Sequence, residues 1–137
     1  MKRLLFVVLT LVTFGAFADN WYSQVLPSAT LTATTVNSVD IHNPSWKGAD
    51  IIVNVSAYTL GTYTPHVQGK DPVSGNYYDI LVGSAIGAAG VTTLHVYPGI
   101  AATANVAASA ILPTTWRVQL VGATPNMTLS VGANLEQ

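Results

Sequence analysis

The segment "DIIVNVSAY", residues Asp50 to Tyr58, carries the clearest structural pattern in the sequence. Side chains alternate along it, with Ile51, Val53 and Val55 on one face and Asn54 among those on the other. Successive side chains of a strand point to opposite sides, so a period of two is typical of a strand with one buried face. We therefore predict a half-buried β-strand over these residues.

The same alternation recurs on both sides of this stretch. The further runs are residues 29–36, 63–70, 76–82, 91–97, 115–121 and 127–133. Segments rich in Gly, Pro, Asn, Asp and Ser separate them, and these residues favour turns. About seven or eight short strands without a helical crossover predict a single antiparallel β-sandwich, Ig-like or jelly-roll-like with Greek-key connections. The alternation in 115–121 places Trp116 in its core, near Val53, Val55 and Leu129.

Two segments between strands raise separate questions. In "QGKDPVSGNYYDIL" (residues 68–81), Pro72 presets φ and Gly75 tolerates a positive φ, so Lys70 to Tyr77 is predicted to be a hairpin connection. Ile100 to Ile111 has apolar residues at roughly helical spacing, which fits either a short helix or an Ala-rich loop. The sequence leaves both alternatives open.

The first residues resemble an export signal. Lys2 and Arg3 precede an apolar run, and Ala16-Phe17-Ala18 forms a small-residue cleavage pattern. We expect residues 1–18 to be a removable leader and residues 19–137 to be a single domain. The alternative is an N-terminal arm or strand that remains part of the protein.

Charge is scarce in this chain of 137 residues. Charged residues make up 8% of it, the formal net charge is −1, and no basic cluster occurs, whereas soluble domains average about 25% charged residues. The sequence thus gives no basic footprint for nucleic acid. Because charged side chains are depleted at protein interfaces, the composition favours a protein that works inside an assembly.

Catalytic and metal-binding patterns are missing from the sequence. It contains no cysteine, and the three histidines (His42, His66 and His95) fall on different strands or turns without metal-ligand spacing. Asp71 and Asp79 flank one predicted hairpin, at turn and solvent-facing positions where aspartate is common. Their positions therefore do not indicate a catalytic pair. We therefore expect no enzyme activity, no catalytic residue, no metal site and no cofactor.

Aromatic side chains are the remaining candidates for contacts. Tyr77, Trp46, Tyr58 and Tyr63 are expected to be exposed, together with Trp21 and Tyr22, and exposed aromatics serve as interface anchors or stack on sugars. Trp46 stands in "HNPSWKG", where it is either a loop-tip aromatic or a lid over one end of the fold.

Two sequence motifs carry a family resemblance. They are Gly69-Lys70-Asp71-Pro72 with Gly75 and Tyr77-Tyr78, and Leu112-Pro113 followed by Trp116-Arg117-Val118. Between Ala29 and Leu135 the chain resembles small structural proteins of tailed phages and prophages, which are β-sandwich virion proteins of the head-decoration type. The resemblance implies no catalytic residues.

These expectations lead to two functions. The first is a virion structural or decoration protein at the capsid surface, which binds the capsid or neighbouring copies of itself. The alternative is a binding module, carbohydrate-binding or adhesin-like, that is secreted or periplasmic after cleavage near Ala18. Phage head proteins normally lack an export signal, so the leader is the feature that favours the alternative.

Overall fold

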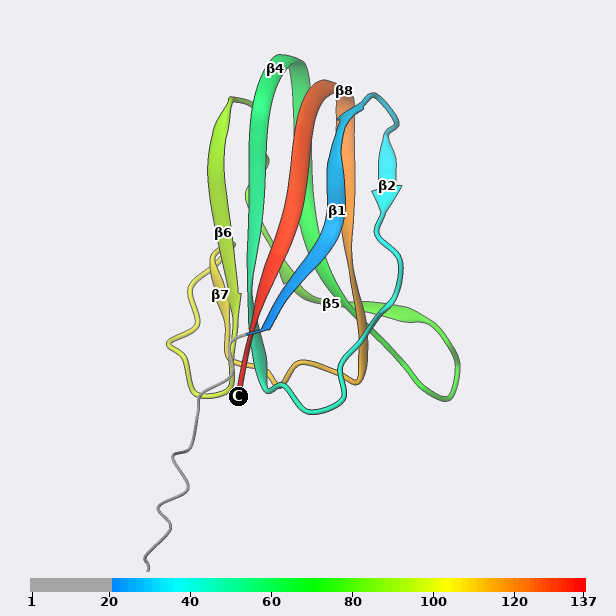
Figure 1. Cartoon of the computed structure of the whole chain (residues 1–137), viewed down its shortest axis with the longest axis vertical. Coiled ribbons are helices and arrows are strands. Elements are labelled where there is room, and N and C mark those ends of the chain that lie inside the picture. Colours follow the sequence, from blue (N-terminus) through cyan, green and yellow to red (C-terminus); the bar gives the residue numbers. More distant parts are fainter. Residues whose placement is uncertain (1–20) are drawn as a thin grey trace, which may run out of the picture.

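The computed structural model describes residues 21–137, which form an all-β fold without a helix (Figure 1). The predicted leader, residues 1–18, lies outside the described residues. Eight strands belong to one hydrogen-bonded sheet. They are β1 (Trp21–Leu31), β2 (Thr35–Asn37), β3 (Ile41–His42), β4 (Gly48–Lys70), β5 (Tyr77–Val82), β6 (Gly90–Val96), β7 (Ala107–Ala108) and β8 (Thr115–Glu136).

The centre of the fold is a long antiparallel ribbon of β4 and β8. Its pairing runs from Gly48 opposite Glu136 to Gly69 opposite Trp116. Figure 1 shows that each of the two strands rises, bends over at the top and returns beside the other. The pairing shifts register beside Gly61, which has a φ of 76°, and a Cβ there would lie 2.2 Å from the carbonyl oxygen of Thr124. Only glycine accommodates both the positive φ and this close approach.

The shorter strands flank the two halves of the ribbon. β1 and β6 pair with the half that holds residues 48–58 and 127–136, whereas β2, β3 and β5 pair with the other half. All these pairs are antiparallel, but β6 and β7 are parallel, with His95 opposite Ala107. The expectation of purely antiparallel pairing is therefore wrong at β7, and the sheet is mixed.

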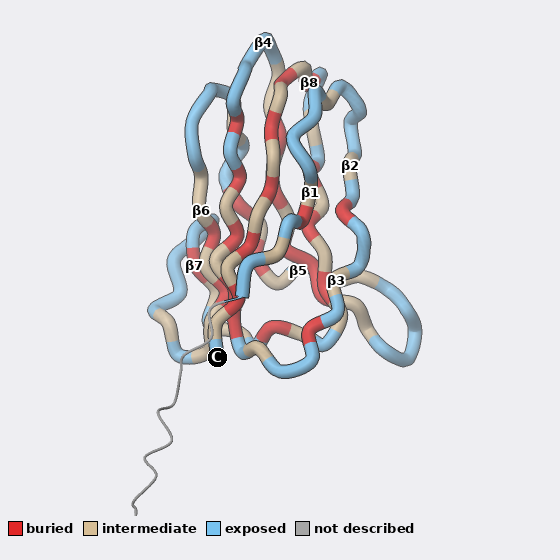
Figure 2. The backbone as a smooth tube through the Cα atoms, viewed as in Figure 1, coloured by how far each residue is buried: buried red, intermediate tan, exposed pale blue. Residues whose placement is uncertain are grey.

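Buried residues occur along both halves of β4 and β8 (Figure 2), and with residues of the flanking strands they form one apolar cluster. The alternating pattern in the sequence predicted these positions, since the buried residues are those on the inward face of each strand. Trp116 is fully buried, as predicted, in the same cluster as Val53, Val55 and Leu129. Its indole Nε1–H has no hydrogen-bond partner.

The structure shows the conformation of both inter-strand segments singled out in the sequence. Lys70 pairs with Tyr77, so the predicted hairpin connection between neighbouring antiparallel strands is confirmed. Between Ile100 and Ile111 the chain is a loop with a turn, in which the carbonyl oxygen of Thr103 accepts hydrogen bonds from the amides of Val106 and Ala107. The loop alternative is therefore correct. Small alanines let this loop lie against β6, where β7 forms.

Tyrosine rings repeatedly lie across glycines of neighbouring strands. The pairs are Tyr97 over Gly48, Tyr78 over Gly69, Tyr63 over Gly122 and Tyr22 over Gly132. A Cβ added at Gly48, Gly69 or Gly122 would lie 2.3, 2.6 or 2.7 Å from the nearest ring atom. The rings thus occupy the space that a side chain would fill, which compensates for the weak packing of glycine in a strand.

Candidate functional site

The four aromatic residues expected at the surface differ in their environment. Tyr58 is exposed, and Tyr77 and Trp46 are half-buried. Tyr63 is fully buried, so the expectation of exposure is wrong for this residue. Its ring packs against Gly122 and its hydroxyl donates to the carbonyl oxygen of Ala33 at 2.6 Å. Burial raises the pKa of the Tyr63 hydroxyl. Tyr63 is therefore a core residue.

Trp46 is positioned by the buried side chain of Asn43. The Asn43 Oδ1 accepts a hydrogen bond from the Trp46 amide at 2.8 Å, and its Nδ2 donates to the Trp46 carbonyl at 2.8 Å. The same Nδ2 lies 3.1 Å from the carbonyl oxygen of Leu112. These bonds fix the loop, and Trp46 packs against the apolar core. Trp46 is therefore a lid over one end of the core, one of the two alternatives that the sequence allowed.

A groove lies beside this lid. We call it the tryptophan groove; it has a volume of about 410 Å³, and Trp21, Trp46, Ser23, Ile41, His42 and Leu135 are among its lining residues. Trp21 stands opposite Leu135 at the start of β1 and is 62% exposed. No Asp, Glu, Lys or Arg of the described residues lines the groove. It is a largely apolar, aromatic concavity with a few neutral polar groups.

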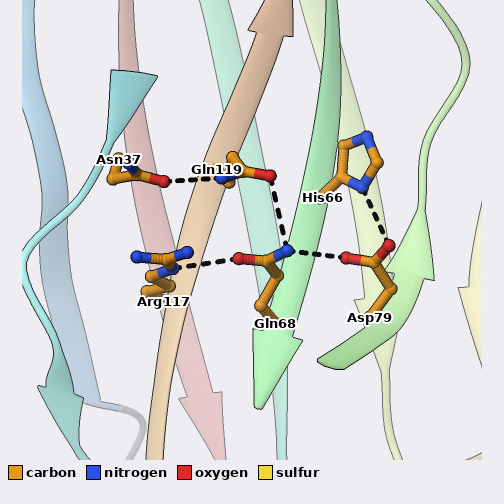
Figure 3. Close-up of polar contacts among 6 residues, drawn as sticks. All are labelled: Asn37, His66, Gln68, Asp79, Arg117 and Gln119. Atoms are coloured by element: carbon orange, nitrogen blue, oxygen red, sulfur yellow. Dashed lines mark hydrogen bonds and ion pairs between the residues drawn. The ribbon is translucent and has the colours of Figure 1, made fainter. Parts of the chain in front are cut away.

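The outer surface of the second half of the ribbon carries a hydrogen-bonded polar network (Figure 3). Gln68, at its centre, accepts a hydrogen bond from the Arg117 Nε at 2.9 Å and donates to the Asp79 Oδ1 at 2.9 Å. His66 Nδ1 lies 3.1 Å from the other carboxylate oxygen of Asp79. Gln119 donates to Asn37 at 2.8 Å. The alternation of residues 63–70 places Gln68 on the outward face of the strand, yet the side chain is buried because these neighbours cover it.

The network continues to the base of the hairpin through Tyr77. The Arg117 guanidinium lies 3.4 Å from the centre of the Tyr77 ring, and the Tyr77 hydroxyl donates to Asp40 at 2.5 Å. Lys70 Nζ also donates to Asp40, at 2.7 Å. The hydrogen bond from Lys70, and then that from Tyr77, lowers the pKa of Asp40. Tyr77 is thus held within the protein.

The tip of the hairpin, residues 71–76, is stabilised by hydrogen bonds within the turn. Asp71 Oδ1 accepts from the Val73 amide at 3.0 Å, and the Asp71 carbonyl accepts from the Gly75 amide at 2.9 Å. The Ser74 hydroxyl bond, followed by the Val73 amide bond, lowers the pKa of Asp71. Figure 1 shows the hairpin projecting beyond the sheet, and Val73 at its tip is 93% exposed.

A second cluster of titratable groups was missed by sequence reasoning. Asp50 and His95 stand opposite each other on β4 and β6, with Asp50 Oδ1 2.5 Å from His95 Nδ1. Glu136 lines the same hollow of about 450 Å³, and burial, followed by the charge of Asp50, raises its pKa. Alternation shows that each side chain faces outward, but only the strand pairing brings them together. Within residues 21–137 no group of three such side chains has the arrangement of a metal site.

Comparisons with models of protein families, with curated proteins and with solved structures give no match to this chain. Among residues 21–137 there is also no helix of the length and apolar character needed to cross a membrane.

Proposed function

We propose that the protein is a non-enzymatic β-sandwich component of a larger assembly, of the virion-decoration type that its sequence resembles. In this proposal the two halves of the folded sheet are the layers of the sandwich. Many copies bind a capsid, or one another, at the capsid surface. The function of each copy is adhesion, so it requires a contact surface and no reaction site.

The observation that carries this proposal is an outer surface over the first half of the ribbon whose centre carries no charge; Asp50, His95 and Glu136 lie at one end of it. We call it the neutral face: outward side chains of β1, β4 and β8 with hydroxyl or amide groups, namely Thr30, Asn54, Ser56, Thr128, Ser130 and Asn134. Thr30 and Thr128 hydroxyls are hydrogen-bonded at 2.7 Å. Side chains of this kind form water-bridged contacts without the cost of burying charge.

The outer surface over the second half of the ribbon is charged, which supports the neutral face as the contact surface. It holds Arg117, Lys70, Asp40 and Asp79, and their hydrogen bonds are made within the protein. Binding there would require these charged groups to lose water while they already have partners. The neutral face has no such charges at its centre, so we place the contact there.

The sheet edge formed by β1 is a less suitable contact. β1 ends the strand order, but it contains Pro27 and two register shifts. Proline and bulges at an edge hinder the addition of another strand. Contacts through the face are also modest individually, and they gain strength when many copies bind a symmetric lattice.

Co-sedimentation with capsids of the encoding phage or prophage tests the proposal. Asn54→Glu places a charge in the middle of the neutral face and should weaken association at least about tenfold, since an unpaired charge at an interface is costly. Val39→Glu puts the same charge at another exposed site and should leave association unchanged. Absence of the wild-type protein from pelleted capsids, together with binding to a defined glycan, would overturn the assignment.

The second candidate is a secreted carbohydrate-binding module. The observation that favours it is the tryptophan groove, because an exposed indole on a concave wall is a typical platform for a sugar ring. A glycan array run on the same preparation distinguishes the two functions.

A further inference from the structure

We propose that the tryptophan groove binds the terminal pyranose ring of an uncharged glycan, with Trp21 as the stacking platform. This inference rests on the second function above and names the site and the ligand class for it. The neutral face and the groove involve different residues, so a capsid-bound protein would retain the groove as a separate site.

The size and lining of the groove fit a small ligand. Its volume of about 410 Å³ lies within the range of about 300–1,000 Å³ that small-molecule sites usually occupy. Trp21, Trp46 and Leu135 supply apolar surface, whereas Ser23 and His42 supply hydrogen-bonding groups. Such a mixture of aromatic walls and a few polar groups is typical of sites that orient a ligand.

The exposure of Trp21 selects an amphipathic ligand. This side chain is 62% exposed, so a molecule lying on it keeps one face in water. A wholly apolar ligand would gain little from such a half-open site, because much of its surface would stay hydrated. A pyranose ring presents C–H groups on one face and hydroxyl groups around its rim. The ring therefore stacks on the indole while its hydroxyls reach Ser23, His42 and water.

The lack of charge in the groove selects an uncharged sugar. No Asp, Glu, Lys or Arg of the described residues lines it, and His42 is its one imidazole. A sialic or uronic acid would lose hydration at its carboxylate without gaining a Lys or Arg partner. A cationic ligand would likewise find no carboxylate. Neutral hexoses and N-acetylhexosamines are the sugars that match this lining.

The groove is also built before any ligand arrives. Asn43 bonds both the amide and the carbonyl of Trp46, and Ile41 pairs with Trp116 at the edge of β8. Trp21 is placed by the pairing of β1 with β8. Binding then requires little ordering of the protein, which reduces its entropic cost.

The test uses the full chain and a panel of gluco-, galacto-, manno- and N-acetylgluco-trisaccharides, with sialylated and uronic acid-containing counterparts. Binding is followed by tryptophan fluorescence and calorimetry. We expect at least one neutral trisaccharide to bind, and Trp21→Ala to weaken it by about tenfold or more, the loss typical of a removed stacking platform. Trp46→Phe, which keeps an aromatic lid, should weaken it less.

Tyr22→Ala is the matched control. Tyr22 is the next residue of β1, is similarly exposed and lies over Gly132 on the other face of the strand. This variant should bind the neutral sugar as the wild type does. The inference is overturned if no neutral member binds, if a charged counterpart binds more tightly, or if Trp21→Ala leaves the affinity unchanged. In those cases capsid co-sedimentation would still decide the assembly function independently.

Discussion

The guanidinium of Arg117 lies over the ring of Tyr77, 3.4 Å from its centre, and joins β8 to the base of the hairpin. The same side chain donates to Gln68. Arg117→Lys keeps the charge but loses the planar stack and the directed hydrogen bond. We expect the free energy of unfolding to fall by about 1–2 kcal/mol in denaturant titrations. Lys47→Arg is the control outside the network, and an equal loss in both variants would contradict the role of the stack.

Trp116 should be the most costly single truncation in the core. It is fully buried, so Trp116→Ala should lower the free energy of unfolding by about 3–5 kcal/mol. Trp116→Phe keeps an aromatic ring and removes an indole N–H that has no partner, so its cost should be clearly smaller. Thermal unfolding of both variants checks this order, and an unchanged melting temperature for Trp116→Ala would place the side chain outside the core.

The tyrosine–glycine pairs predict a steric penalty without backbone strain. Gly122→Ala puts a Cβ 2.7 Å from the Tyr63 ring, which cannot move without losing its bond to Ala33. We expect a loss of about 1–3 kcal/mol from overpacking. Gly75→Ala is the complementary variant: its Cβ meets nothing within 4 Å, but its φ is 74°. Its cost should be about 1 kcal/mol and should come from the backbone alone.

Asp40 should stabilise the fold only while it is ionised. Its pKa is lowered by the hydrogen bond from Lys70 and then by that from Tyr77. A lowered folded-state pKa means that this stabilisation is present above the unfolded value of about 4 and is lost as the pH falls through the folded value. Asp40→Asn should therefore destabilise the protein by about 0.5–1 kcal/mol at neutral pH. Urea unfolding should show no such loss in strong acid, and an equal loss at both pH values would contradict this assignment.

Glu136 should have the opposite effect. Burial, and then the charge of Asp50, raises its pKa, so the folded protein holds this proton more tightly than the unfolded chain does. Stability should then decrease as the pH rises above the ordinary value of 4.5 and Glu136 ionises. Glu136→Gln removes this penalty and should raise the melting temperature at neutral pH by a few degrees at most. At pH values where Glu136 is protonated, the two proteins should melt together.

Alternation predicted the core positions well because it depends only on neighbours along the chain. Leu94, Val96 and Leu120 are buried as their patterns require. The bend in β4 was not predicted: residues 50–58 and 63–70 were predicted to be two strands, separated by a turn that contains Gly61. They form one strand because β8 pairs along both halves. A glycine alone does not show whether its neighbours end a strand or bend it.

The candidate sites likewise include features that neighbouring residues predict and features that only strand pairing creates. The hairpin was predictable because its turn residues are adjacent in sequence. The tryptophan groove was not, since Trp21 and Trp46 line one hollow only after β1 pairs with β8 and the Asn43 loop folds beneath it. The burial of Gln68 likewise depends on Arg117 and Asp79, which come from neighbouring strands.

The pairing of β4 with β8 also leads to an expected order of folding. Gly69 and Trp116 are the ribbon partners closest along the chain, and Gly48 and Glu136 are the most distant, so loop-closure entropy favours zipping from the former pair to the latter. β8 leaves the ribosome long after β4, and until then the inward residues of β4 lack their partner. We expect folding to be completed only after β8 is synthesised, on the slow timescale of proteins dominated by non-local pairing. During synthesis, the unpaired β4 is the segment that a chaperone would have to shield from aggregation.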